Sequence, residues 1–355
     1  MIRFENDYAE GAHRKILQKI LETNEEQTPG YGTDVHCENA RAFIRKACDT
    51  ADADIHFLVG GTQTNATVIA SILRPHQGIV AAITGHIAIH ETGAIEATGH
   101  KVLTLPSDDG KIQAEQVQAL YAAHWNDAAH EHIVQPGMVY ISHPTENGTT
   151  YSKAKLEELS AICRKYNLPL FLDGARLGYG LASKNSDLTL VDIARLCDVF
   201  YIGGTKVGAL FGEAVVIVND SLKKDFRYLM KQRGGLLAKG RLLGIQFETL
   251  FEAGLYEKIS YHAVELAMRI RQAFVEKGVS LRYDSMTNQQ FPILSKEAIT
   301  LLSEKYAFSL WEPFNDTHTV VRFCTSWATK KEHVEMLIED IHKVNLQSVG
   351  VPSSQ

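Results

Sequence analysis

Three short polar segments of this chain contain residue types suited to chemistry, and each follows an apolar run typical of a buried strand. Gly60 to Asn65, with the sequence GGTQTN, opens an apolar helical pattern, and the free backbone N–H groups at such a helix start favour phosphate. Asp173 follows the second run, where an ionised carboxylate needs a cationic or hydrogen-bonding partner. Lys206 follows the third run between small residues, and a partly desolvated lysine has a lowered pKa and attacks carbonyl groups.

Each segment also has an ordinary structural explanation when it is taken alone. A glycine turn with a Thr cap accounts for the first, a helix N-cap for Asp173 and a solvated loop for Lys206. The glycine segment is neither a Walker loop nor GxGxxG, which disfavours ATP and dinucleotides. Together, however, a phosphate cradle, a carboxylate and a lysine are the parts needed to hold pyridoxal 5′-phosphate (PLP). The lysine would form a Schiff base and the carboxylate would keep the pyridine nitrogen protonated, so the segments predict PLP as cofactor.

The elements that must position these residues alternate between strand and helix. The predicted strands are Ile55–Val59, Ile79–Ile83, Lys101–Leu105, Met138–Ser142, Leu170–Asp173, Val199–Gly203 and Ala214–Val218. The helical pattern is clearest in Lys153–Tyr166, with Ser152 as its N-cap. Strands that are apolar on both faces and alternate with helices indicate an α/β fold with a mostly parallel sheet covered on both sides. Only about ten residues separate the last two strands, which favours an antiparallel pair.

A second α+β unit is predicted after about residue 220, where this rhythm changes. Its predicted elements are a helical stretch near 221–277, strands at Val279–Tyr283, Phe291–Leu294 and Val320–Phe323, and helices near 296–305 and 330–344. We expect a large cofactor-binding domain over residues 1–245, which includes the N-terminal segment, and a small C-terminal domain over residues 246–355. The last ten or so residues are expected to form a tail.

The composition excludes several classes of protein. The chain has 355 residues with 36 basic and 42 acidic side chains, and its net charge of −6 argues against nucleic acid or anionic membranes as partners. Apolar runs fall far short of the ~20 residues that cross a bilayer, and no secretory signal pattern is seen, which predicts a cytoplasmic protein. The five cysteines have no C-x-x-C spacing, and Cys163 and Cys197 are expected to fill the core. No metal is expected, because two histidine pairs are not completed by further ligands.

With these segments in view, the sequence resembles a known family: the threonine aldolase branch of the β-eliminating lyases, PLP enzymes of fold type I, which share the aspartate-aminotransferase fold. The segments that carry the resemblance are Asn6–His13, Tyr31–Asp34, Phe57–Asn65, Gly85–Gly93, His143–Tyr151, Phe171–Leu181, Gly203–Ala214 and Val320–Thr329. They run in the family's order across nearly the whole chain, and LDGAR followed by TK and a distal VRF is highly specific in combination. The forms PTENGTTY and TKVGALFGEA look closest to the low-specificity threonine and phenylserine aldolases.

The resemblance implies a role for individual residues around the cofactor. Lys206 would form the Schiff base and Asp173 would pair with the pyridinium nitrogen. The further contacts implied are Gly61, Thr62, Gln63 and Thr205 at the phosphate, His86 with Glu91 in support at the ring face, and Arg241 and Arg233 at the phosphate of a neighbouring subunit. The resemblance therefore also implies a homodimer at least, or a homotetramer.

For the substrate, the resemblance implies that Arg176 and Arg322 clamp the carboxylate of an amino acid, a role that suits arginine. Tyr31 would reach across a dimer interface. Asn6 departs from the family, because it replaces the serine that contacts the carboxylate, so an amide would have to make that hydrogen bond. The stretch around HPTENG also departs from the most typical aldolases, and both changes bear on side-chain specificity.

The reaction that these roles imply is a retro-aldol cleavage of a β-hydroxy-α-amino acid, such as threonine, allo-threonine or phenylserine, to glycine and an aldehyde. His86 is the leading base for the β-hydroxyl proton, although stacking alone would also explain it; His90, His130 and His132 are reserves. One alternative is a PLP-dependent β-eliminating lyase for another amino acid, which would release pyruvate and ammonia. Another is a PLP-binding protein without activity, which the intact set of Lys206, Asp173, Arg176 and Arg322 disfavours.

Overall fold

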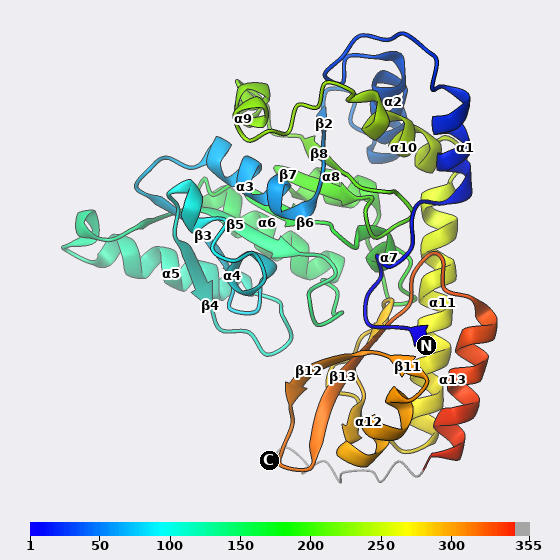
Figure 1. Ribbon diagram of the computed structural model, residues 1–355. Coiled ribbons are helices and arrows are strands. Elements are labelled where there is room, and N and C mark those ends of the chain that lie inside the picture. Colours follow the sequence, from blue (N-terminus) through cyan, green and yellow to red (C-terminus); the bar gives the residue numbers. More distant parts are fainter. Residues whose placement is uncertain (345–355) are drawn as a thin grey trace.

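A seven-stranded sheet forms the centre of the computed structural model, which describes residues 1–344 (Figure 1). Its strands, in the order β2-β8-β7-β6-β5-β3-β4, are β2 Asp54–Leu58, β3 Gln77–Ala82, β4 Val102–Leu105, β5 Gln135–Ser142, β6 Leu170–Asp173, β7 Val199–Gly203 and β8 Glu213–Ile217. Strand β8 runs antiparallel to both of its neighbours, and every other pair is parallel. The predicted α/β class, the mostly parallel sheet and the antiparallel final pair are confirmed.

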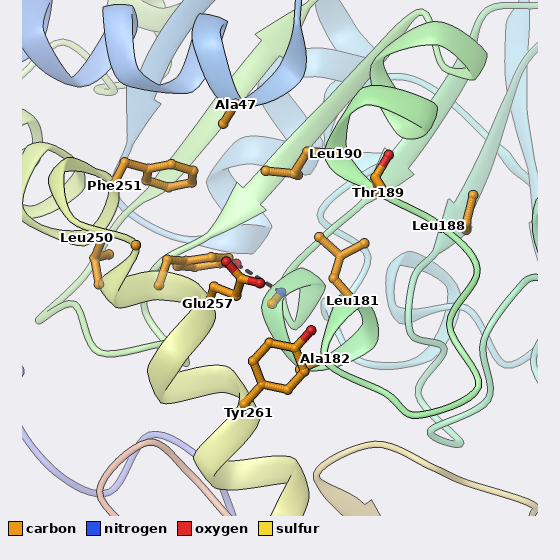
Figure 2. A pocket seen from close by; sticks show the side chains of 13 residues that line it. Ala47, Leu181, Ala182, Leu188, Thr189, Leu190, Leu250, Phe251, Glu257 and Tyr261 are labelled. Carbon is orange, nitrogen blue, oxygen red and sulfur yellow. Dashed lines mark hydrogen bonds between the residues drawn. The ribbon is translucent and has the colours of Figure 1, made fainter.

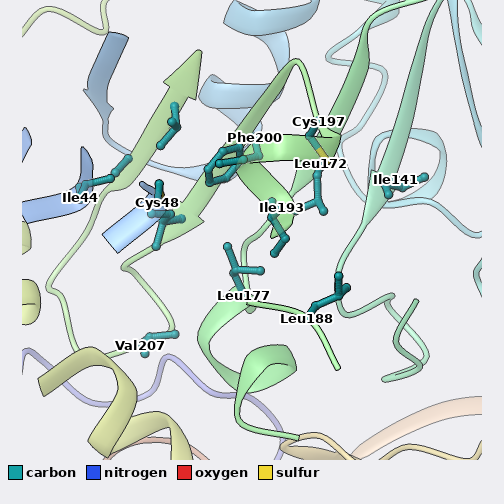
Figure 3. Close-up of a cluster of buried hydrophobic side chains, with 14 of the residues drawn as sticks. Ile44, Cys48, Ile141, Leu172, Leu177, Leu188, Ile193, Cys197, Phe200 and Val207 are labelled. Carbon is teal, nitrogen blue, oxygen red and sulfur yellow. The ribbon is translucent and has the colours of Figure 1, made fainter. Parts of the chain in front are cut away.

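Helices cover both faces of this sheet. Successive strand residues point to opposite faces, and because these residues are apolar, both faces must be buried. Leu170 and Leu172 of β6 belong to one buried apolar cluster and Phe171 to another. Figure 3 shows part of the first cluster, where Leu172 and Phe200 meet Ile44 and Ile193 from the covering helices. The helices up to β8 are α1 Arg14–Glu22, α2 Val35–Cys48, α3 Gly61–Ile72, α4 His86–Ile89, α5 Ala114–Asn126, α6 Lys153–Lys165, α7 Leu177–Leu181 and α8 Leu190–Leu196.

The clearest predicted helix is confirmed as α6, which begins at Lys153 and ends one residue earlier than predicted. Ser152 is its N-cap, with its hydroxyl oxygen accepting a hydrogen bond from the Lys155 backbone N–H at 3.4 Å. Cys163 and Cys197 lie in the core, as predicted, and the other three cysteines are buried and unpaired as well. Figure 3 shows Cys48 and Cys197 among the apolar side chains. A buried free cysteine acts as a small hydrophobic residue.

A smaller antiparallel sheet, in the order β10-β13-β12 with β9 also paired to β13, forms a second unit. The elements after β8 are α9 Phe226–Gln232, α10 Arg241–Glu252, α11 Leu255–Glu276, β9 Gln289–Gln290, β10 Ile293–Ser295, α12 Lys296–Ser303, β11 Tyr306–Ala307, β12 Ser309–Pro313, β13 His318–Cys324 and α13 Lys331–Lys343. The amino terminus lies beside this unit, because β1 Ile2–Arg3 pairs in parallel with β11 (Figure 1).

Three details of the C-terminal prediction are wrong. Val279–Tyr283 is not a strand, because its partner segment contains Pro292, which has no N–H to donate, and only the single bridge Leu281–Pro292 forms. The stretch near 221–277 is three helices rather than one, since Gly234 and Gly254 adopt positive φ angles of 71° and 65° between them. Strand β12 was not predicted, because its sequence SLWEP has little alternation and ends in proline.

The predicted tail lies outside the described residues. The predicted domain boundary at residue 245 falls inside α10, so the division into 1–245 and 246–355 stays a prediction. Among the helices of residues 1–344, none combines the length and the apolar character needed to span a membrane.

Candidate active site

A cavity of about 310 Å³ opens at the carboxyl ends of the parallel strands. This is the edge at which open α/β sheets bind ligands. Seven of the predicted site residues line it: Gly61, Thr62, His86, Asp173, Arg176, Thr205 and Lys206. These residues come from segments as much as 145 positions apart in the chain, so the parallel topology has brought together what the sequence keeps separate.

A second cavity, of about 380 Å³, lies between α7, α8, α10 and α11 and shares no residue with the first (Figure 2). Its lining is mainly apolar, with Leu181, Leu190, Leu250 and Phe251 among the residues that Figure 2 labels. Among the residues that the structure describes, its lining includes one carboxylate, that of Glu257, and no lysine, histidine or arginine. The first cavity is therefore the candidate active site.

Asp173, the last residue of β6, is only 4% exposed and accepts four hydrogen bonds. Its donors are the hydroxyls of Tyr201 and Tyr140 (2.6 Å for the latter), the amide of Asn65 (3.1 Å) and the backbone N–H of Ala175 (3.0 Å). Burial alone would raise the pKa of this carboxyl, but the charge of His86 and these hydrogen bonds outweigh it, so the pKa lies below its usual range. Asp173 is not a helix N-cap, since Arg176 precedes α7 in that position.

The two tyrosines were not predicted. Tyr140 lies on β5 and Tyr201 on β7, the neighbours of β6 on either side, and both belong to the same apolar cluster as Phe171. Side chains on one face of adjacent strands meet, so their hydroxyls reach the strand end at Asp173. They hold a negative charge in a buried position, as is required of a group that pairs with a pyridinium nitrogen.

Lys206 lies in the loop between β7 and β8. Its amino group makes no hydrogen bond or ion pair with any residue in the described range 1–344, while its backbone carbonyl accepts a hydrogen bond from the Tyr179 hydroxyl at 2.6 Å. Burial and the nearby positive charge of Arg176 lower the pKa of this amine. A lysine held free of partners with a lowered pKa is suited to attack a carbonyl carbon.

Glu213, the first residue of β8, is a buried carboxyl group in this cavity that the sequence reasoning missed. It accepts hydrogen bonds from the Thr205 hydroxyl (2.9 Å) and the Gly204 backbone N–H (3.1 Å). Burial raises its pKa to about 8. The available signal was a charged residue opening the otherwise apolar run AVVIV.

His86 begins α4, and its ring is held by a buried acid. The ring Nδ1 lies 2.8 Å from Glu91 Oε1, and the Asn65 amide donates to both that oxygen (2.7 Å) and Asp173 (3.1 Å). Burial lowers the pKa of the imidazole, but the hydrogen bond that its Nδ1–H donates to Glu91 and the charge of Asp173 raise the pKa above its usual value overall. Since Nδ1 is engaged, Nε2 is the nitrogen that remains to handle a proton.

Glu146 is a second carboxyl group that was not predicted. It is buried beside His86, where it accepts hydrogen bonds from the Ser142 hydroxyl (2.6 Å) and the His86 backbone N–H (3.0 Å). Burial raises its pKa. It belongs to the HPTENG stretch in which the chain departs from typical aldolases, so this departure lies in the cavity wall.

The start of helix α3 supplies the predicted phosphate cradle. Within residues 1–344, the backbone N–H groups of Gly61, Thr62 and Gln63 have no partner, while that of Thr64 is the first to bond back, to Gly60. A Cβ at Gly61 would lie 3.2 Å from the Tyr201 hydroxyl, so glycine keeps this wall open. The Gln63 side chain lies outside the cavity, where it accepts from Val59 N–H and donates to Arg233 O, both at 3.1 Å.

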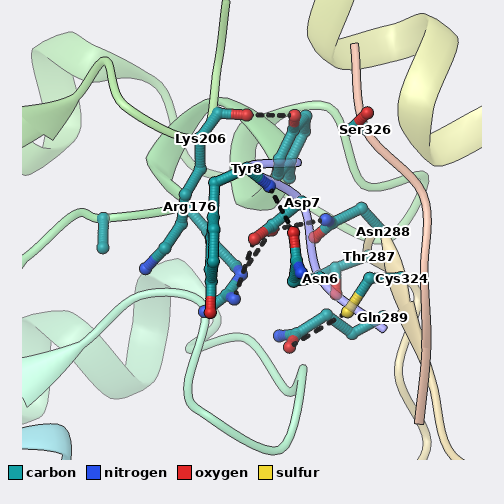
Figure 4. A network of polar contacts seen from close by, with 12 residues as sticks. Asn6, Asp7, Tyr8, Arg176, Lys206, Thr287, Asn288, Gln289, Cys324 and Ser326 are labelled. Atoms are coloured by element: carbon teal, nitrogen blue, oxygen red, sulfur yellow. Dashed lines mark hydrogen bonds and ion pairs between the residues drawn. The ribbon is translucent and has the colours of Figure 1, made fainter. Parts of the chain in front are cut away.

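Arg176 forms a buried ion pair with Asp7 (Figure 4). Its Nε and Nη2 lie 2.6 and 3.0 Å from the two carboxylate oxygens of Asp7. Asn6 next to Asp7 does not line the cavity; its side-chain oxygen accepts from the Tyr8 backbone N–H at 3.0 Å. The contact predicted for Asn6 with a substrate stays a prediction.

The other predicted arginines and Tyr31 also lie outside this cavity. Arg322 donates to the Glu5 carbonyl at 3.0 Å and stacks 4.8 Å from the Trp311 ring. Arg241 donates to the carbonyls of Asn24 and Glu26, and Tyr31 is 47% exposed. The reserve bases are outside it as well: the His90 ring lies 5.6 Å from that of His86, and His130 and His132 are in an outer 3₁₀ turn.

Comparison with known proteins identifies the family that this geometry represents. The model of the family described as "Beta-eliminating lyase" matches residues 13–301. The chain belongs to this family. Low-specificity L-threonine aldolases from a Pseudomonas species and from Pseudomonas aeruginosa are 29% and 28% identical over 346 residues, covering 96% of this chain and 97% of each relative.

Solved structures place the chain in the threonine aldolase branch of the family. The threonine aldolase of Leishmania major is 45% identical, with a TM-score of 0.94 over 97% of this chain and 99% of that one. An aspartate aminotransferase from Thermus thermophilus, at 13% identity, has a TM-score of 0.71 over 97% of this chain and 91% of that one, which shows the fold alone. The predicted fold type I is confirmed.

The enzyme is therefore a PLP-dependent lyase, and its cavity fits that cofactor. The free N–H groups of α3 suit a phosphate, and the buried, ionised Asp173 suits a pyridinium nitrogen. Lys206 has an amino group without a partner in residues 1–344, and its pKa is lowered, as a Schiff base requires. Gly61, Thr62, Asp173 and Lys206, which supply these properties, all line this one cavity.

Proposed function

We propose that the enzyme cleaves a β-hydroxy-α-amino acid of the threonine type to glycine and an aldehyde. The observation that carries this proposal is the convergence of Lys206, Asp173, His86 and Arg176 on one cavity at the strand ends. The relatives that match nearly the whole chain are named threonine aldolases, which supports the same substrate class.

PLP, when bound, supplies an acceptor for the electron pair of the Cα–Cβ bond that breaks. The residues of the chain would then divide the remaining tasks. Lys206 would hold the cofactor, and Asp173 would keep the positive charge on its ring nitrogen. Arg176 binds the substrate carboxylate and so fixes which bond at Cα faces the ring.

His86 is proposed as the base that takes the β-hydroxyl proton. Its Nδ1 is bound to Glu91, so the proton would pass to Nε2 as the hydroxyl oxygen becomes the carbonyl oxygen of the leaving aldehyde. A raised imidazole pKa makes this nitrogen more basic, and a base poised near neutral pH is the most effective one. Cα then takes up a proton to give glycine, which balances the reaction.

The experiment that tests this proposal identifies the products. PLP-loaded enzyme is incubated separately with L-threonine, L-allo-threonine and phenylserine, and glycine, aldehyde, 2-oxo acid and ammonia are measured, with Lys206→Ala as the control. Equal amounts of glycine and aldehyde support the proposal. 2-Oxobutyrate from either threonine, or phenylpyruvate from phenylserine, released with ammonia would instead establish β-elimination. No product from any of the three amino acids would establish a protein that binds PLP without turning them over.

We also propose that the active enzyme is a homodimer or homotetramer. Tyr31 and Arg241 lie outside the cavity of their own subunit, and Tyr31 and Tyr228 expose 47% and 77% of their surface. Light scattering measures the mass, and mixing inactive Lys206→Ala with Arg241→Ala subunits restores activity only if sites are shared. A cytoplasmic location is part of the same proposal, since five unpaired cysteines suit a reducing compartment.

A further inference from the structure

The guanidinium group of Arg176 has two edges on which a carboxylate can form a pair of parallel hydrogen bonds. One edge consists of Nε and Nη2, and the other of Nη1 and Nη2. Asp7 occupies the first edge, with distances of 2.6 Å and 3.0 Å (Figure 4). Nη1 has no hydrogen-bonding partner among residues 1–344, and Arg176 lines the cavity that contains Lys206. The second edge is thus left for another carboxylate.

Asp7 is itself held in place from the C-terminal unit. The Asn288 amide donates to Asp7 Oδ2 at 2.9 Å and to the Thr325 carbonyl at 2.8 Å. The chain just before Asp7 is fixed to β13, where the Cys324 backbone N–H donates to the Phe4 carbonyl at 2.7 Å. Asp7 is fully buried, so its carboxylate has little freedom to move.

The charges at this ion pair are consistent with that arrangement. Burial would raise the pKa of the Asp7 carboxyl, but Arg176 and Lys206 lower it overall, so Asp7 stays ionised. A bidentate pair between an ionised carboxylate and a guanidinium fixes both the position and the plane of the arginine. Two carboxylates can therefore bind Arg176 at once, one structural and one from the substrate.

We propose that Asp7 is a positioning residue, which holds Arg176 so that its Nη1/Nη2 edge faces the carboxylate of the amino-acid substrate. This inference rests on the proposed function, in which Arg176 binds that carboxylate. Asn288 acts one step further out, by fixing Asp7. The arrangement makes recognition of the carboxylate depend on a residue that never contacts the substrate.

The test compares two ligands that differ only in the carboxylate. Glycine and methylamine are titrated calorimetrically into PLP-loaded wild type and into Asp7→Asn. We expect the dissociation constant of glycine to rise about tenfold or more in the variant, because a misplaced binding group loses most of its contribution. The dissociation constant of methylamine should not change, because it does not use Arg176. With threonine as substrate, KM should rise more than kcat falls.

Asp198→Asn is the control. Asp198 accepts a hydrogen bond from the Asn219 side-chain amide, as Asp7 does from that of Asn288, and one from the Leu170 backbone N–H, but it lies at the opposite end of β7. It should leave both dissociation constants unchanged. Asn288→Ala retains Asp7 but removes the hydrogen bond that Asn288 donates to it, so the dissociation constant of glycine should rise by a smaller factor than in Asp7→Asn. This variant also tests the inference if Asp7→Asn does not fold.

Three results would overturn the inference. Unchanged glycine affinity in both Asp7→Asn and Asn288→Ala would show that Arg176 is positioned without Asp7. An equal rise for glycine and methylamine would show general damage to the cavity. If Asp198→Asn weakened glycine binding as much as Asp7→Asn did, the effect would come from reduced stability alone. If the wild type releases no glycine from threonine, the proposed function itself fails, and that outcome is seen before any variant is compared.

Discussion

The buried charge on Asp173 can be tested through the tyrosine hydroxyls that donate to it. Tyr140→Phe removes the 2.6 Å hydrogen bond and leaves the ring in its apolar cluster. A hydrogen bond to a buried charged group contributes about 1.5–3 kcal/mol, so we expect the free energy of unfolding at neutral pH to fall by about 2 kcal/mol. Because the hydroxyl stabilises the ionised form, its removal should also raise the pKa of Asp173 in the variant.

The pH dependence distinguishes this loss from ordinary destabilisation. The pKa of Asp173 in the folded state lies below 3.8, the ordinary value for Asp. The ionised carboxylate therefore stabilises the folded state above pH 3.8, and this stabilisation is lost as the pH falls through the folded pKa. In Tyr140→Phe the folded pKa is higher. The stability difference from wild type is therefore constant near neutral pH and shrinks once the pH falls below the variant's own pKa.

Urea unfolding of the apoprotein between pH 7 and about pH 4 measures this difference without a contribution from cofactor affinity. Tyr151→Phe is the matched control: Tyr151 is equally buried, but its hydroxyl accepts from the uncharged Ile112 backbone N–H at 2.8 Å. The decrease in the free energy of unfolding caused by Tyr151→Phe should not vary with pH. If the loss in Tyr140→Phe is also independent of pH, Asp173 is not the charged partner of that hydroxyl and the reasoning is refuted.

Three further predictions follow from the same network. Asp173→Asn should retain the fold, shown by an unchanged circular dichroism spectrum, but lose most of its glycine production, because a neutral amide does not keep the pyridine nitrogen protonated; unchanged turnover would contradict this. Glu91→Gln removes a hydrogen bond that raises the pKa of His86, so the acid limb of the pH profile of kcat/KM should move to lower pH, and an unmoved limb would exclude His86 as the titrating group. Glu213 has a folded pKa of about 8, above its ordinary value of 4.5, so the folded state binds the extra proton and wild type loses stability as the pH rises through this interval. Urea unfolding should therefore show Glu213→Gln gaining stability relative to wild type from about pH 5 to pH 8, whereas a constant difference would place the carboxyl in contact with water.

Much of the cavity could be predicted because its central residues follow predicted strands directly. Asp173 ends β6, Lys206 lies three residues after β7, and Gly61 lies three after β2. In a parallel sheet the carboxyl ends of the strands share one edge, so three local patterns are enough to place these groups together. No knowledge of the register between strands is required.

The residues that were missed depend on contacts far apart in the chain. Asp7 meets Arg176 across 169 positions. It lies in a segment that carries the family resemblance, but nothing in that segment indicates that its partner is Arg176. Tyr140 and Tyr201 look like ordinary strand residues until the order β7-β6-β5 and the shared sheet face are known. Each of these residues becomes a functional candidate only because its polar group is buried. That burial results from the packing of the whole fold and is not encoded in the local sequence.

Arg176 and Arg322, the two arginines expected to bind a carboxylate, differ in how firmly they are held, and residue type alone does not determine this. Arg176 is fixed by an ionised partner, and no residue of the described range 1–344 occupies its second hydrogen-bonding edge. Arg322 is held by a backbone carbonyl, by Gln289 and Ser309 at 3.3 and 3.4 Å, and by the Trp311 ring, and its Nε is buried without a partner among residues 1–344. Because carbonyl and amide contacts fix a guanidinium less firmly than a bidentate carboxylate does, Arg322 can turn towards a ligand at lower cost. We expect a preorganised arginine and an adaptable one to bind the same carboxylate. Both contact the amino-terminal segment, but only Arg176 is held there by an ionised side chain, whereas Arg322 contacts the Glu5 backbone carbonyl.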